Sequence, residues 1–165
     1  MTTQTSINLK PFCAKPGGRY SLDAPFVIGG WLYATDGAVI VRIPATSEPD
    51  VGLERKVPRK LEAYLPTVAD DATWHAFPKV KECLPCAGHG FIDVPCPTCG
   101  QDTKKMCECK ATAIRLGPAE VAEYYASLIA SLPGVQYVKP ATANDIVRFR
   151  FDGGEGSVMP LQPSG

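Results

Sequence analysis

Apolar and polar positions in the first half of the chain form two short runs that meet at an Asp-Gly dipeptide. The runs Trp31-Leu-Tyr-Ala-Thr35 and Ala38-Val-Ile-Val-Arg-Ile43 are rich in β-branched and aromatic residues, and Asp36-Gly37 joins them. Such residues favour strands, and Asp-Gly is favoured in two-residue hairpin turns because it tolerates positive φ. The pattern predicts a β-hairpin over residues 31–43.

A longer apolar period follows in the last third of the chain. Between Pro118 and Leu132 the apolar residues are spaced three and four apart, as in the buried stripe of a helix. Pro118 suits a first helical turn, and Pro133-Gly134 ends the pattern. We therefore expect a helix over residues 118–132, with a stripe made of Val121, Tyr124, Tyr125, Leu128, Ile129 and Leu132.

Further short elements surround this helix. A helix is predicted over residues 59–65, and strands are predicted over residues 73–77, 135–139, 146–151 and 157–161, with a glycine-rich turn at residues 152–156. In the third of these strands apolar residues alternate with Arg148 and Arg150, which predicts one buried and one wet face. The order of elements predicts an α+β fold, an antiparallel sheet with a helix packed on one face.

Six of the seven cysteines lie between the two predicted halves of this fold. They form Cys83-Leu-Pro-Cys86, Cys96-Pro-Thr-Cys99 and Cys107-Glu-Cys109. Paired thiols at such spacings bind one tetrahedral metal ion about 2.3 Å from each sulfur. The sequence thus predicts a structural Zn²⁺ site in a ribbon over residues 81–110, inserted between residues 1–80 and 111–165 of one α+β domain.

The sequence leaves the ligand set open. The preference for Cys-x-x-Cys knuckles favours a site made of Cys83, Cys86, Cys96 and Cys99, with Cys107 and Cys109 outside it. The outer pairs are a second possible set, and two ions held by all six thiols are a third. His89 is a further potential ligand, although a polar loop histidine is the simpler interpretation.

Nothing in the sequence favours a disulfide framework, which needs an oxidising compartment. Residues 1–10 lack a basic segment followed by an apolar one, and no apolar run approaches the roughly 18 residues that span a bilayer. We expect a cytoplasmic protein with reduced thiols and no membrane contact.

Charge and length limit the functional classes. The 165 residues, of which 45% are apolar, suffice for one core, and 17 basic residues balance 17 acidic ones. Zero net charge argues against strong autonomous nucleic-acid binding and leaves room for a local basic patch. Two groups of basic residues could form such a patch. The first consists of Arg55, Lys56, Arg59 and Lys60, and the second of Lys79, Lys81, Lys104, Lys105 and Lys110. In the second group we expect Lys104 and Lys105 to contact a partner.

The sequence does not favour an enzyme. His75 and His89 are the only histidines, and neither a nucleophile-elbow motif nor a metalloprotease motif occurs. Thiolate-rich zinc sites are usually closed and structural. We therefore expect a non-enzymatic protein.

Two segments resemble the bacterial DNA polymerase sliding clamp. Residues 116–162, ending in Val158-Met159-Pro160-Leu161, are similar to the last part of its third domain, and Tyr33-Ala-Thr-Asp-Gly37 is similar to a hairpin of that family. The resemblance implies a single clamp-type module that acts in or around DNA replication. In the family this terminal segment borders an apolar cleft for partner peptides, which implies that Met159, Pro160 and Leu161 bind a protein partner.

A second, local resemblance concerns the cysteines. Cys83-Leu-Pro-Cys86-Ala-Gly-His-Gly90 is similar to the Cys-x-x-Cys-x-Gly-x-Gly repeat of DnaJ-type co-chaperones, and residues 96–100 form a partial repeat. The resemblance implies an alternative function, a co-chaperone-like or scaffold protein that binds peptides. The main hypothesis is a non-enzymatic zinc-binding interaction module, whose small size and metal staple would suit a phage protein.

Overall fold

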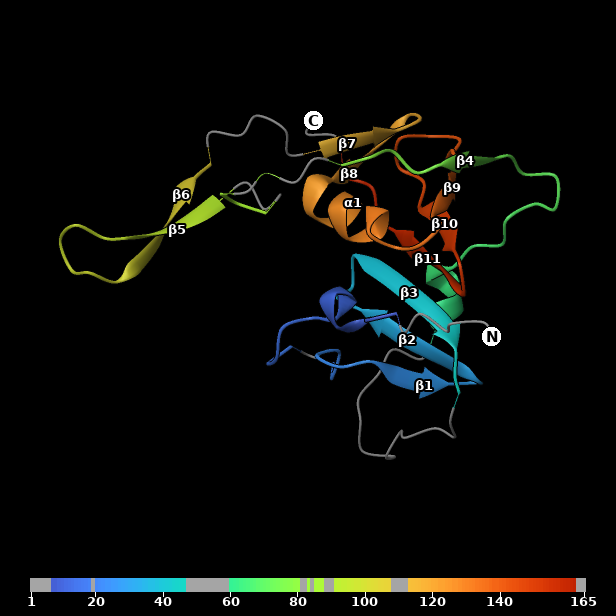
Figure 1. The fold of residues 1–165 in the computed structure, drawn as a ribbon, viewed down its shortest axis with the longest axis horizontal. Helices are drawn as coiled ribbons and strands as arrows, with labels where there is room; N and C mark the ends of the chain where they lie inside the picture. The colour runs from blue at the N-terminus through green and yellow to red at the C-terminus, as the bar shows by residue number, and fades with distance from the viewer. Residues whose placement is uncertain are drawn as a thin grey trace.

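The computed structural model describes residues 7–18, 20–46, 60–80, 83, 85–87, 91–107 and 113–162. Its body is a seven-stranded antiparallel sheet in the order β1-β2-β3-β11-β10-β9-β4 (Figure 1). The strands are β1 Phe26–Ile28, β2 Trp31–Thr35, β3 Val39–Pro44, β4 Trp74–Ala76, β9 Gln136–Val138, β10 Val147–Phe151 and β11 Gly154–Val158.

Strands from before and after the cysteine segment share this sheet. In the centre β3 pairs with β11, where Val41 lies opposite Gly156, and at the edge β4 pairs with β9, where His75 lies opposite Tyr137. The chain therefore leaves the sheet after β4, passes through the cysteines and returns to complete it.

The hairpin predicted over residues 31–43 is confirmed as β2 and β3, but its turn is longer than the two residues expected. The last paired residues are Thr35 and Ile40, so four residues lie between them. The Asp36 carboxylate accepts the N–H groups of Ala38 and Val39 at 2.9 and 3.1 Å, and Gly37 has φ +99°. The side chain of Asp36 thus provides the hydrogen-bond acceptor for two backbone N–H groups that have no partner on a neighbouring strand of the described sheet.

One face of the sheet carries the main core. Alternate residues of the central strands, among them Val41, Val147 and Phe149, pack there against Ala126 and Ile129 of the single α-helix found in the described residues, α1 Glu123–Ala130. All five are fully buried. Gly156 permits this packing, because a Cβ there would collide with the Ile40 carbonyl and the Phe149 ring. Part of the glycine run predicted as a turn is therefore strand β11.

The opposite face carries a smaller cluster made of Leu22, Phe26, Tyr33, Ile40, Leu61 and Leu65. Two 3₁₀ helices, η1 Lys10–Phe12 and η2 Leu61–Tyr64, pack on the sheet, and η2 contributes Leu61 to this cluster. The face predicted to be wet along β10 is only partly so, since Arg148 is 8% exposed. Its guanidinium donates to Glu155 and to the Gly156 carbonyl, both at 2.7 Å, and these bonds compensate for part of the cost of its burial, since the buried Nε has no partner among the described residues.

The predicted helix over residues 118–132 is too long. Residues 119–122 form strand β8 Ala119–Ala122, which pairs with β7 Ala113–Leu116 across the turn at Gly117-Pro118. Gly117 has φ +66°, and Ala119 and Val121 are buried while Glu120 is exposed, a period of two. Gly-Pro therefore acts as a turn signal here, not as the start of a helix.

The fold class expected from the sequence is consequently wrong. The described residues contain eleven strands and one α-helix of eight residues, so the fold is mainly antiparallel β and not a helix-packed α+β clamp. The predicted strands over residues 73–77, 135–139 and 146–151 are found as β4, β9 and β10.

The cysteine segment forms a separate two-stranded hairpin. Strand β5 Phe91–Pro95 pairs with β6 Asp102–Met106, and this β5–β6 hairpin extends away from the body at one side (Figure 1). In the described part of the chain, no helix combines the length and apolar character that crossing a membrane needs.

Candidate functional site

Three thiols gather at the base of the β5–β6 hairpin. The sulfurs of Cys83, Cys86 and Cys107 all lie within 4.8 Å of one another. Cys86 is buried and the other two are half-buried. The turn of Cys83 to Cys86 is closed by the Ala87 N–H, which donates to the Cys83 carbonyl at 2.7 Å while Ala87 takes φ +48°. Cys107 arrives from the other strand, directly after β6.

The spacing of these sulfurs fits a tetrahedral metal ion. Four sulfurs about 2.3 Å from one ion are about 3.8 Å apart along each edge of the tetrahedron. The sulfurs of Cys83 and Cys107 are 3.8 Å apart, far beyond the roughly 2.05 Å of a disulfide. This cluster can hold a metal ion, and it supplies three of the four thiolates that a closed site needs.

Cys96 and Cys99 lie at the other end of the hairpin. The Cys96 N–H donates to the Gln101 carbonyl at 2.8 Å, so Cys96 is level with Gln101 on the opposite strand. Gln101 and Cys107 are six residues apart along an extended strand. At about 3.4 Å per residue, the two ends of the hairpin are therefore about 20 Å apart. Sulfurs on one ion are at most about 4.6 Å apart, so the two ends cannot share an ion.

The structure thus brings together Cys83, Cys86 and Cys107, three members of the second ligand set considered above, which combines the first and last cysteine pairs. It separates the two Cys-x-x-Cys turns, which the first ligand set had placed on one ion. The physical reason is strand β5, which extends Phe91–Pro95 between the knuckles instead of folding them onto each other. Cys109 lies outside the described residues, as do His89, Lys81, Lys110, Arg55, Lys56 and Arg59.

The sulfur of Cys96 sits among backbone donors. Hydrogen bonds from the backbone N–H groups of Cys99 and then Thr98, with the Cys99 thiol adding a further one, lower the pKa of the Cys96 thiol. These bonds favour the thiolate, which is the form that binds metals.

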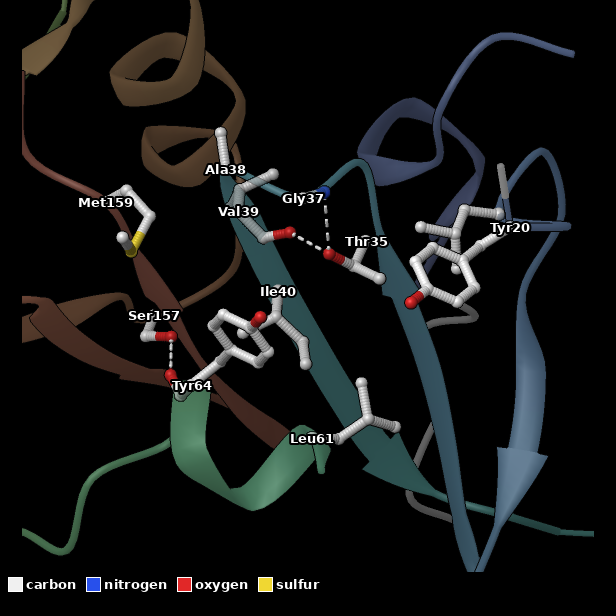
Figure 2. Close-up of a pocket in the computed structure, with 11 residues that line it drawn as sticks. Tyr20, Thr35, Gly37, Ala38, Val39, Ile40, Leu61, Tyr64, Ser157 and Met159 are labelled. Atoms are coloured by element: carbon white, nitrogen blue, oxygen red, sulfur yellow. Dashed lines mark hydrogen bonds between the residues drawn. The ribbon is translucent and has the colours of Figure 1, made fainter. Parts of the chain in front are cut away.

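A second candidate site lies on the body, on the face of the smaller cluster. A pocket of about 140 Å³ opens between the β2–β3 turn, η2 and the end of β11 (Figure 2). Its apolar lining comes mainly from Tyr20, Leu22, Ile40, Leu61, Tyr64 and Met159. The side chains of Tyr20, Tyr64 and Met159 are 39–44% exposed, which makes this an open apolar surface.

Two hydroxyl groups of the pocket are engaged within the protein. The Thr35 hydroxyl donates to the Val39 carbonyl at 2.6 Å and accepts the Gly37 N–H at 3.1 Å, and the Ser157 hydroxyl donates to the Tyr64 carbonyl (Figure 2). These two hydroxyls already have partners, and an apolar group that enters the pocket gains free energy from burial.

The helix steadies one wall of this pocket. The Tyr125 hydroxyl donates to the Asp36 carboxylate at 2.6 Å, which ties α1 to the β2–β3 turn. Burial, followed by the hydrogen bond and charge of Asp36, raises the pKa of Tyr125 well above its ordinary value. Tyr125 therefore stays protonated at neutral pH and can donate to Asp36 there.

The structure gives three different environments to the predicted peptide-binding residues. Met159 lines the pocket, Pro160 is buried, and Leu161 is 42% exposed outside the pocket lining. Lys104 and Lys105 are exposed on β6, where Lys104 lies opposite Asp93.

Sequence reasoning missed the residues that build most of the pocket. Tyr20, Leu61 and Tyr64 come from loops and a 3₁₀ helix, where no periodic pattern marks them. The available signal was an aromatic residue in an otherwise irregular segment, as at Tyr20 and Tyr64. Large exposed aromatic side chains of this kind are enriched at interfaces.

Comparison of the chain with family models, with curated proteins and with solved structures gave no match.

Proposed function

We propose that this protein is a non-enzymatic interaction module that binds an apolar peptide segment of a partner protein in the pocket beside Met159, and that zinc staples its β5–β6 hairpin. The observation that carries the first part is the open apolar pocket rimmed by Tyr20, Tyr64 and Met159.

The size of the pocket favours a peptide over a small-molecule ligand. Sites for drug-sized molecules enclose roughly 300–1,000 Å³, whereas an apolar cavity of about 150 Å³ holds a group the size of benzene. At about 140 Å³ the pocket admits one large apolar side chain. A peptide that inserts one such anchor and covers the exposed rim fits this surface.

Zinc is the metal proposed for the base of the hairpin. Soft thiolate ligands and a tetrahedral arrangement favour Zn²⁺, and Cys83, Cys86 and Cys107 supply three thiolates. Cys109, two residues beyond Cys107 in the sequence, is the proposed fourth ligand. The bound ion would offset half of the charge of four thiolates and join the two ends of the hairpin, and these residues would hold it without leaving a position open for catalysis.

An association with DNA replication is proposed from the resemblance to sliding clamps. The two segments that carry it supply neighbouring parts of the pocket wall, Thr35 and Gly37 from the first and Met159 from the second. The segment that the resemblance implied for peptide binding thus borders an apolar pocket, which supports a replication protein as the partner.

The alternative function, a co-chaperone-like or scaffold protein, is supported by a different surface. Phe91 and Met106 lie opposite each other at the base of the β5–β6 hairpin and are 54% and 70% exposed. Such an apolar pair suits weak contacts with many unfolded peptides. This alternative predicts suppression of client aggregation that is lost in Phe91→Ser/Met106→Ser and kept in Met159→Asp.

The test of peptide docking compares two neighbouring substitutions. Short peptides with leucine or phenylalanine anchors, and the same peptides with alanine, are titrated against the wild-type protein, Met159→Asp and Leu161→Asp. Burial of an apolar anchor predicts salt-insensitive binding that weakens at least about tenfold in Met159→Asp, because a charge would be desolvated there.

Leu161→Asp is the matched control, since Leu161 is equally exposed but lies outside the pocket lining. Equal loss of binding in both variants, or binding that disappears with salt, would contradict docking in the pocket.

A further inference from the structure

The two Cys-x-x-Cys turns of the hairpin share two backbone features although they lie at opposite ends. At the tip the Gly100 N–H donates to the Cys96 carbonyl at 2.9 Å, as the Ala87 N–H does to the Cys83 carbonyl at 2.7 Å. In both turns the residue after the second cysteine is left-handed, with φ +72° at Gly100 and +48° at Ala87. The tip therefore has the same knuckle that, at the base, takes part in a three-thiol cluster.

The tip also holds its two cysteines in one tight loop. The Cys96 N–H donates to the Gln101 carbonyl at 2.8 Å, which closes the loop that carries Cys96 and Cys99. Cys99 is exposed, as are residues 97–101 around it. The two thiols are thus arranged like ligands and are accessible from outside.

Two thiols fill half of a four-coordinate site, and the other thiols of the cysteine segment are too far along the chain to reach the tip. The base cluster is about 20 Å away, and Cys109 is only two residues, at most about 7 Å of chain, beyond Cys107. His89 precedes Phe91 by two residues, so the same limit of chain length applies to it. Among the described residues, no histidine, aspartate or glutamate joins Cys96 and Cys99 in a cluster of three ligand atoms.

We propose that Cys96 and Cys99 are half of a zinc site that the same two cysteines of a second copy complete, which joins two chains tip to tip. Structural zinc sites are almost always closed by four protein ligands. A two-fold axis through the ion supplies the missing pair without any further residue, because each chain presents the same surface to the other.

The position and the charge of the tip permit this contact. The hairpin extends away from the body, so the bodies of two chains stay apart when the tips meet (Figure 1). Along the two strands Asp93 and Asp102 balance Lys104 and Lys105, so two hairpins carry no excess of like charge. The interface itself is small, and the metal provides most of its stability.

The experiment measures mass and zinc content together. Wild-type protein, Cys96→Ser/Cys99→Ser and Gln101→Ala are purified under a non-chelating reductant, which keeps the thiols reduced, and analysed by native mass spectrometry and sedimentation with zinc and after chelation. We expect a wild-type dimer with about 1.5 zinc ions per chain, one at each base and one shared. Chelation is expected to halve the mass.

The double variant should be a monomer that keeps about one zinc ion per chain, which shows that its hairpin is still formed. Gln101→Ala, at an exposed position of the same loop, should behave like the wild type. A dimer with about 0.5 zinc ion per chain would support the shared site at the tip and contradict the proposed zinc site at the base. The experiment therefore tests the two sites independently.

Three results would overturn the tip-to-tip site. The first is a wild-type monomer at micromolar concentration with excess zinc. The second is a dimer that persists in Cys96→Ser/Cys99→Ser, and the third is a monomer that binds about two zinc ions per chain.

Discussion

The body and the β5–β6 hairpin are stabilised by different physical means. The body buries large apolar side chains on both faces of its sheet, and residues such as Phe149, Ile129 and Val147 are wholly inaccessible. In the described part of residues 83–107 only Cys86 is buried, and all five residues of β6 are exposed. The body is therefore stabilised by an apolar core, whereas the hairpin has no such core in its described residues and instead carries clustered thiols.

This difference indicates which region a bound metal would stabilise. An isolated two-stranded hairpin is at best marginally stable in water, because it cannot bury enough apolar surface to offset the loss of chain entropy. Structural zinc in small zinc-finger peptides contributes about 10–16 kcal/mol. A metal at Cys83, Cys86 and Cys107 would therefore decide whether the hairpin is ordered, and it would have little effect on the body.

The largest expected effect is the loss of the hairpin on removal of its metal. Cys107→Ser is expected to lower the zinc content by about one ion per chain and to abolish hydrogen-exchange protection in residues 91–106. Protection in β10 and β11 should remain, because these strands are held by the apolar core. Exchange measured by mass spectrometry reports both regions in one experiment.

Cys13→Ser is the matched control for Cys107→Ser, since Cys13 packs against the main core of the body. It should leave both the zinc content and the protection of the hairpin unchanged. If Cys107→Ser instead keeps its zinc, or exposes body and hairpin together, the proposed division between the two regions is wrong.

The next substitution destabilises the core of the body and leaves the cysteines unchanged. Phe149→Ala removes a fully buried ring and should cost about 3–5 kcal/mol of the free energy of unfolding of the body. Both tryptophans, Trp31 and Trp74, lie in the body, so their fluorescence reports its unfolding alone.

The zinc site should still fill in Phe149→Ala at temperatures where the body is folded, because no ligand is touched. Simultaneous loss of zinc and of the tryptophan signal in this variant would show that the hairpin depends on the body.

A smaller effect is expected for the ion pairs of the body. Burial alone would raise the pKa of Glu155, but hydrogen bonds and charges from Arg42 and Arg148 outweigh it and lower this pKa. The resulting stabilisation is complete above the ordinary carboxyl pKa of about 4.3 and is lost as the pH falls through the lower folded value.

Thermal unfolding followed by tryptophan fluorescence checks this dependence. Glu155→Gln should melt below the wild type at pH 7, and the difference should shrink as the pH falls below the ordinary carboxyl pKa of about 4.3 towards the lower folded value. A constant difference at both pH values would contradict the pKa direction.

The smallest expected effect concerns nucleic acid and the hairpin surface. Lys104→Glu/Lys105→Glu should weaken any low-salt binding to single-stranded or duplex DNA, measured by fluorescence anisotropy, without changing the zinc content. The zero net charge of the chain limits this binding to weak affinity that disappears at physiological salt. Lys79→Glu, on the body, serves as the charge control, and equal effects of both changes would remove the hairpin from any DNA contact.

Local patterns predicted individual strands well and tertiary arrangement poorly. The β2–β3 hairpin, β4, β9 and β10 follow from β-branched and aromatic runs bounded by turn residues. The helix was overextended because Val121 satisfies both periods: it lies in the three-and-four stripe with Tyr124 and Tyr125, and it alternates with Glu120 in β8. The Gly117 turn decided between them.

The chemistry of the cysteines was readable from the sequence, but their grouping was not. Spacing identifies thiols that can bind a metal ion, whereas the grouping of these thiols depends on whether the residues between the two Cys-x-x-Cys turns fold back or extend. They extend in β5, so Cys107 joins Cys83 and Cys86 while Cys96 stays at the tip. The pocket was even less predictable, because its wall combines Tyr20, Tyr64 and Met159 from distant parts of the chain.

The central claim is that one metal ion is held by the thiols at the base of the hairpin. X-ray absorption at the zinc edge of Cys96→Ser/Cys99→Ser, with elemental analysis of the same sample, tests it without interference from the tip. The account predicts about one zinc ion per chain, surrounded by sulfur at about 2.3 Å. A chain without zinc, or an ion surrounded mainly by oxygen and nitrogen, would contradict it.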